Sequence, residues 1–134
     1  MRRFLPGSSF IFAFILLAVV PAYADDTKIL GTVELYTQAL KAGDVEEIKR
    51  LLGGRLYEKR RVLLEENTEY SDWLKQYYAG ASFSFPTGVT SSDQYPGKLV
   101  NVQIQRGNGE TVTTNLLMQS PTGSDKWEIV DQFR

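Results

Sequence analysis

Two polar residues lie where the sequence pattern expects apolar ones, and Arg60 is the first of these candidate functional residues. At 100° per residue it falls within the apolar arc that Leu56, Leu63 and Leu64 form on a predicted helix. Its aliphatic stem could cover apolar surface while the guanidinium reaches the rim or pairs with a carboxylate. Alternatively, the guanidinium faces a cavity and binds an anionic group through its planar fork. The sequence leaves both alternatives open.

Asp131 is the second such residue, because it shares the two-residue period of Trp127, Ile129 and Phe133 in the last predicted strand. If Asp131 lines a cavity, loss of water would raise its pKa and make it a candidate general base. If the strand end turns outward, the carboxylate is solvated or paired with an arginine. A single salt bridge between Arg60 and Asp131 would satisfy both descriptions.

Three aromatic residues, Tyr36, Trp73 and Tyr77, are expected on the inner arcs of their helices. Aromatic side chains at helical spacing commonly form core. Their hydroxyl and indole groups need polar partners when buried, so a cavity that they line would suit a small, partly apolar ligand. Together with Arg60 and Asp131 they form the predicted ligand site.

The composition excludes several chemistries. The 134 residues include no His and no Cys, so there is no imidazole base, no thiolate nucleophile and no ordinary zinc site. Neither a cofactor nor a metal is expected. Any catalysis would have to use carboxylate, Tyr, Lys or Arg side chains.

The N-terminal half of the chain is predicted to be helical. Ile29, Val33, Tyr36 and Leu40 form one stripe of a helix over residues 27–42, which Gly43 ends. Further helices are predicted over residues 44–52, 55–66 and 68–79. The first of these begins with Asp44 and Glu47 in a capping box, and Gly53 and Gly54 follow it.

The C-terminal half changes to a two-residue period. Strands are predicted over residues 82–85, 98–106, 110–120 and 126–133, and residues 86–97 are predicted to form a loop. Val100, Val102 and Ile104 occupy one face of the second strand. Helices followed by an antiparallel meander predict an α+β domain whose helices cover one face of the sheet.

These features resemble the NTF2-like superfamily. The resemblance rests on the stretch from Tyr36 to Asp44, with its Gly43-Asp44 helix break, and on Lys126-Trp-Glu-Ile-Val-Asp131 after a late hairpin. It is closest to an uncharacterised branch of small secreted bacterial envelope proteins, and it implies a curved sheet wrapped around a long helix as a cystatin-like cone. Many NTF2-like enzymes have a strand pair within the segment matching residues 45–79, where only helix is expected here, and no catalytic residue is carried over.

The first 24 residues resemble a Sec-type signal peptide, so residues 25–134 are expected to be the single mature domain. A basic start at Arg2 and Arg3 precedes eleven apolar residues at 10–20, and Ala22-Tyr23-Ala24 predicts cleavage after Ala24. The apolar run is shorter than the roughly 20 residues of a spanning helix, which disfavours a retained membrane anchor. The predicted location is the periplasm or outside the cell.

The mature chain would carry 13 basic and 16 acidic residues, a net charge of −3. This mildly acidic balance argues against a nucleic-acid partner. The leading hypothesis is a non-catalytic exported domain that binds a small ligand or a peptide between sheet and helices. The alternatives are an assembly module that forms a homodimer through the outer face of its sheet, and a carboxylate-dependent isomerase or hydrolase with Asp131 as its base.

Overall fold

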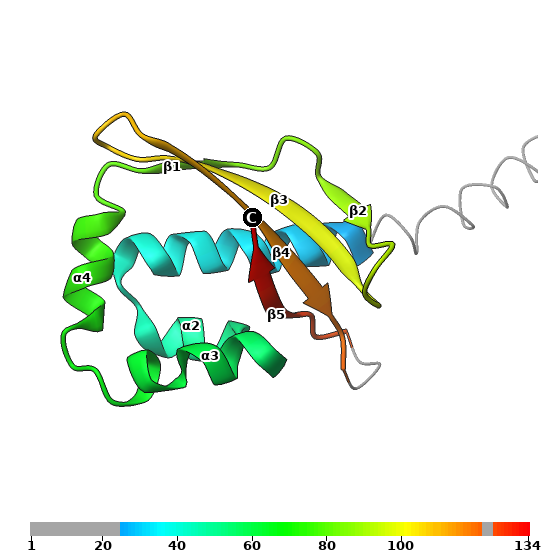
Figure 1. Cartoon of the computed structure of the whole chain (residues 1–134), viewed down its shortest axis with the longest axis horizontal. Helices are drawn as coiled ribbons and strands as arrows, with labels where there is room; N and C mark the ends of the chain where they lie inside the picture. Colours follow the sequence, from blue (N-terminus) through cyan, green and yellow to red (C-terminus); the bar gives the residue numbers. More distant parts are fainter. Residues whose placement is uncertain (1–24, 122–124) are drawn as a thin grey trace, which may run out of the picture.

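Within the residues that the structure describes, four helices pack against an open, five-stranded antiparallel sheet, which confirms the predicted α+β class (Figure 1). The structure, a computed structural model, describes residues 25–121 and 125–134. The predicted signal peptide lies outside the described residues. Among the helices of the described segments, none has the length and apolar character needed to cross a bilayer.

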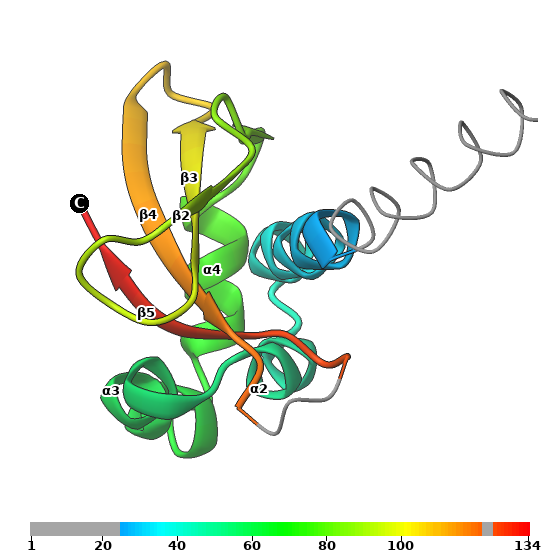
Figure 2. The same ribbon diagram turned by 90° about the vertical axis from the view of Figure 1, so that its right-hand side faces the viewer.

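The first helix, residues 25–42, runs along one face of the sheet (Figures 1 and 2). Its predicted stripe is confirmed, because Ile29, Val33, Tyr36 and Leu40 are all buried. They pack against the alternate residues of the sheet that face them, which include Val100, Val102, Leu116 and Ile129. This contact is the hydrophobic core, and we call this side of the sheet the inner face.

Three short helices follow, α2 (Val45–Leu51), α3 (Gly54–Glu65) and α4 (Tyr70–Tyr77). The predicted cap of α2 is confirmed, because the Asp44 carboxylate accepts a hydrogen bond from the Glu47 backbone N–H at 3.2 Å. The fourth helix is shorter than predicted. In the linker before it, the Asn67 side chain accepts the Glu69 backbone N–H at 2.9 Å and forms an Asx turn.

The strands are β1 (Ser82–Ser84), β2 (Val89–Ser91), β3 (Lys98–Gln105), β4 (Thr111–Gln119) and β5 (Glu128–Phe133). The sheet order is β1-β3-β4-β5, and β2 pairs with the same edge of β3 as β1 does. The prediction of an uninterrupted loop over residues 86–97 is therefore wrong. The backbone of Val89–Ser91 can pair with β3 because the turn at Gly88 brings the chain back to that edge.

The connection after β2 lies against the side of the sheet that faces away from the first helix (Figure 2). Tyr95 in this connection packs on Phe133, with ring centroids 5.9 Å apart. The Gln119 side chain also donates to the Pro96 carbonyl at 2.6 Å. The connection therefore covers part of the outer face and leaves the inner face to the helices.

A β-bulge in β5 places Ile129 and Asp131 on opposite faces of the sheet, although the two-residue period of the sequence puts them on the same face. Ile129 pairs with Met118, whereas Asp131 pairs with Leu117, and the register shifts between the two pairs. The extra residue, Val130, turns the strand so that Ile129 faces the core while Asp131 faces outward. The predicted shared phase of these two residues is therefore wrong.

Helix α3 is attached to the free edge of β5. Leu52 forms an isolated parallel bridge with Ile129, and the Gly53 N–H donates to the Ile129 carbonyl at 2.9 Å. The positive φ of Gly54, 51°, lets α3 begin immediately after this contact. As a result, one turn of α3 is placed beside the last residues of β5.

Candidate functional site

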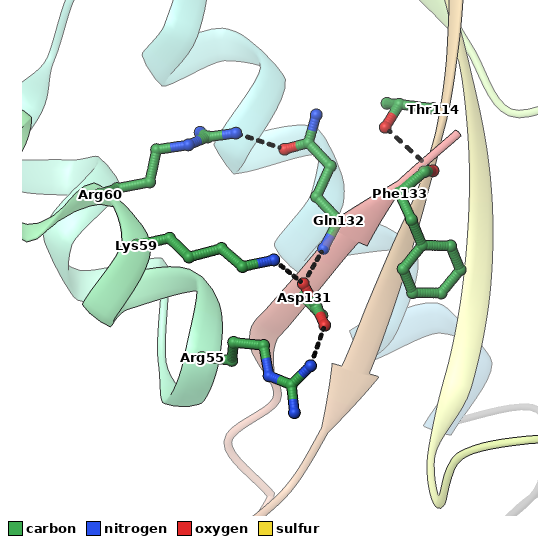
Figure 3. A network of polar contacts seen from close by, with 7 residues as sticks. All are labelled: Arg55, Lys59, Arg60, Thr114, Asp131, Gln132 and Phe133. Atoms are coloured by element: carbon green, nitrogen blue, oxygen red, sulfur yellow. Dashed lines mark hydrogen bonds and ion pairs between the residues drawn. The ribbon is translucent and has the colours of Figure 1, made fainter.

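Arg60 lies where α3 meets the first helix and β5. Its guanidinium donates to the side-chain oxygen of Gln132 at 2.8 Å (Figure 3). It also donates to the Tyr36 hydroxyl at 3.3 Å. Among the described residues no Asp or Glu forms an ion pair with Arg60, and Asp131 pairs with Lys59 and Arg55 instead, so the alternative of a carboxylate partner is wrong. A half-buried cation is thus held by neutral groups alone.

Two opposing influences act on this cation. Burial acts to lower the pKa of Arg60, but the surrounding tyrosines, Tyr36 foremost, outweigh it and the pKa lies above its ordinary value. Arg60 therefore keeps its charge at every physiological pH. A charged group that is partly removed from water without an opposite charge favours the approach of an anion.

A cleft of about 270 Å³, here called the sheet cleft, lies between the helices α3 and α4 and the strands β3, β4 and β5. Its walls combine apolar, hydroxyl and cationic side chains: Leu56, Lys59, Arg60, Tyr77, Tyr78, Ile104, Val112, Thr114, Gln132, Phe133 and Arg134. The cations in this set are Lys59, Arg60 and Arg134, and no described Asp or Glu lines the cleft. Because Asp131 pairs with Lys59 at 3.2 Å, the half-buried cation that this cleft offers to an anion is Arg60.

A larger hollow of about 420 Å³, here called the helix pocket, lies among the helices. Its apolar walls come from the first helix, α3 and α4, and its polar groups are Arg60, Asn67 and Glu69. Trp73 borders it but is 51% exposed, so the expectation of Trp73 on an inner arc is wrong. The ring is instead held by stacking between Tyr70 and Tyr77, at centroid distances of 6.0 and 4.9 Å.

Tyr78 and Arg60 both line the helix pocket and the sheet cleft. They also line a void of about 30 Å³ beside Tyr36. Burial raises the pKa of the Tyr78 hydroxyl, so it stays protonated and can donate. Burial likewise raises the pKa of Tyr70, and the nearby Arg60 partly opposes the rise. Arg60 and the tyrosine hydroxyls thus present several hydrogen-bond donors at the junction of the cavities.

Asp131 lies apart from this junction. Its carboxylate is 3.2 Å from the Lys59 ammonium and 3.9 Å from the Arg55 guanidinium, and it accepts the Gln132 backbone N–H at 2.9 Å (Figure 3). Partial burial acts to raise its pKa, but that hydrogen bond and Lys59 outweigh it and the pKa falls below its ordinary value. A carboxylate stabilised as an anion is a poor general base, so the alternative in which Asp131 lines a cavity with a raised pKa is wrong. The alternative of an outward carboxylate paired with an arginine agrees with the contact to Arg55.

The structure therefore brings together four of the five predicted site residues around two hollows. Arg60 and Tyr36 touch, Tyr77 lines the sheet cleft and Trp73 borders the helix pocket, whereas Asp131 does not join them. Sequence patterns missed Tyr78, Gln132 and Lys59. Tyr78 follows the buried Leu74 by four residues and so lies on the same helical face, which could have signalled its place. The bulge that turns Gln132 inward leaves no local signal.

Comparison of the chain with models of protein families, with curated proteins and with solved structures found no match. The candidate site must therefore be judged on its own geometry. Within residues 25–121 and 125–134, no group of three or more Asp and Glu side chains is arranged to hold a metal ion. The chemistry that the donors at Arg60 can perform is the binding of an anionic group.

Proposed function

We propose that this chain is an exported, NTF2-like domain that binds a small anionic ligand at Arg60 and catalyses no reaction on it. The cone-like arrangement, the export and the cleavage after Ala24 are parts of this proposal. The observation that carries it is the half-buried Arg60 guanidinium, which has neutral hydrogen-bond partners among the described residues and borders a cleft that no described Asp or Glu lines.

The energetics favour a binding role for Arg60 over a structural one. A structural arginine in the core gains most from a carboxylate partner, since two opposite charges compensate each other's loss of water. Arg60 lacks that partner, although the mature chain would carry 16 acidic residues. An anionic ligand would provide the compensation and would add hydrogen bonds to a planar fork already oriented by Tyr36 and Gln132.

The proposal is tested by native mass spectrometry of the mature chain, purified directly from the cell envelope without refolding. Wild-type protein is compared with Arg60→Gln and with Arg61→Gln as a matched control. Arg61 is the next residue on α3, is 53% exposed and pairs only loosely with Glu58 at 3.9 Å.

A bound small anion is expected in the wild type and in Arg61→Gln, and its loss is expected in Arg60→Gln. The same mass in all three proteins would show that Arg60 does not bind the ligand. If the wild type carries no ligand, a panel of small carboxylates, sulfonates and phosphates is screened by thermal shift. Stabilisation that survives in Arg60→Gln, or none with any anion, would contradict the proposal.

A further inference from the structure

The helix pocket differs from the sheet cleft in the character of its walls. Its apolar side chains are Leu40, Leu63, Leu74 and the rings of Tyr70, Trp73 and Tyr78. No strand residue of the described chain contributes to it. At about 420 Å³ it falls in the size range of pockets for small organic ligands.

Arg60 connects the two hollows. It projects from the middle of α3 and lines the helix pocket and the sheet cleft alike, as does Tyr78. The other charge in the helix pocket, Glu69, lies on the exposed linker between α3 and α4. A ligand in this pocket therefore meets a half-buried cation, apolar walls and, at Glu69, one solvent-exposed carboxylate.

The exposed apolar side chains around this pocket support the same assignment. Trp73 is 51% exposed and Leu63 is 37% exposed, and both line the pocket. Stacking against Tyr70 and Tyr77 holds the Trp73 ring at the mouth before any ligand arrives. A preorganised aromatic wall loses little conformational freedom on binding, so contact with an apolar body contributes directly to affinity.

We infer that the ligand is an amphiphilic monoanion whose charged group binds Arg60 and whose apolar body lies in the helix pocket, against Trp73 and Leu63. This inference rests on the proposed function and deepens it by naming the ligand class. Alkyl carboxylates of graded length are the simplest probes of this class. Each methylene buried in the pocket strengthens binding about fourfold.

The experiment measures the dissociation constants of butanoate, hexanoate and octanoate by calorimetry. Leu63→Trp is designed to fill the helix pocket with a larger side chain. Leu63→Phe fills it with a smaller increase in side-chain volume. Val62→Trp is the matched control, since Val62 is the preceding residue, is 57% exposed and lines neither hollow. Val112→Trp narrows the sheet cleft instead, because Val112 lines that cleft alone. Circular dichroism verifies that each variant is folded.

Affinity is expected to rise about fourfold per methylene in the wild type, in Val62→Trp and in Val112→Trp, and to lose this dependence in both Leu63 variants. If Val112→Trp removes the dependence and the Leu63 variants keep it, the apolar body lies in the sheet cleft. That result overturns this inference and leaves the proposed function intact.

Two further outcomes separate the inference from the proposed function. If no carboxylate of the series binds while native mass spectrometry finds an anion that depends on Arg60, only the ligand class is overturned. If the carboxylates bind Arg60→Gln as tightly as the wild type, the proposed function itself fails.

Discussion

The guanidinium of Arg60 donates to the side-chain oxygen of Gln132 over 2.8 Å, and this contact connects the middle of α3 to the inner face of β5. The preceding strand residue, Asp131, turns to the other face and pairs with Lys59. The β-bulge thus keeps the available carboxylate away from Arg60. In this account, that separation is what leaves the cation free to bind an anion.

The planar shape of the Arg60 guanidinium should contribute to the affinity for octanoate in addition to its charge. Arg60→Lys keeps the cation, but a lysine cannot reach Tyr36, Gln132 and a ligand together in one plane. We expect octanoate binding to weaken about tenfold by calorimetry, with Arg61→Lys unchanged. Equal affinities for Arg60→Lys and wild type would mean that only the charge acts there.

Glu69 is the acidic residue that lines the helix pocket. Glu69→Gln should strengthen octanoate binding about twofold at low salt, because an exposed like charge near the mouth is removed. The gain should disappear in 0.5 M salt. A gain that persists at high salt would indicate a change in pocket shape instead of a charge effect.

The turn after the first helix should tolerate no side chain at Gly43. Its φ is +67°, and a Cβ there would lie 2.6 Å from the Ser71 carbonyl oxygen, so Gly43→Ala should destabilise the fold by at least about 2 kcal/mol. The measurement is urea unfolding at 25 °C. Little change would show that the packing between this turn and α4 is looser than described.

Gly31, inside the first helix, provides the opposite case. Nothing lies within 4 Å of a Cβ added there, so Gly31→Ala should stabilise the fold by about 0.8 kcal/mol through helix propensity. The same urea titration measures this change. Destabilisation by Gly31→Ala would contradict the described packing of the first helix.

Asp131 should make stability depend on acid pH. Its folded-state pKa lies below the ordinary value of 3.8, so the carboxylate stabilises the fold above that value and loses this effect as pH falls through the lower folded pKa. Asp131→Asn should cost about 1 kcal/mol at pH 7 and progressively less below about pH 4. A cost that grows as the pH falls would imply a raised pKa, the property of a general base.

The sequence predicted those elements whose periodicity reflects burial directly. The stripe from Ile29 to Leu40 and the alternation of Val100, Val102 and Ile104 both bury the expected residues. Arg60 could be singled out because a charged residue within an apolar arc is unusual. In each case, neighbours within one element were enough to reveal which face is buried.

The features that the sequence could not predict depend on contacts between distant segments. The bulge at Val130 reverses the face of Asp131, and it appears only once β5 is paired with β4. Trp73 remains half exposed, and the two rings that stack on it, Tyr70 and Tyr77, lie on its own helix. β2 exists because its backbone pairs with β3, although its own residues resemble a loop.

The central claim, that Arg60 binds the anionic group of a ligand, is tested most directly by NMR. The guanidinium N–H signal of Arg60, assigned by its absence in Arg60→Gln, is followed during titration with octanoate. We predict a saturable shift of this signal with the dissociation constant found by calorimetry, and no matching shift at Arg55 or Arg61. An Arg60 signal that stays in place while octanoate binds would contradict the account.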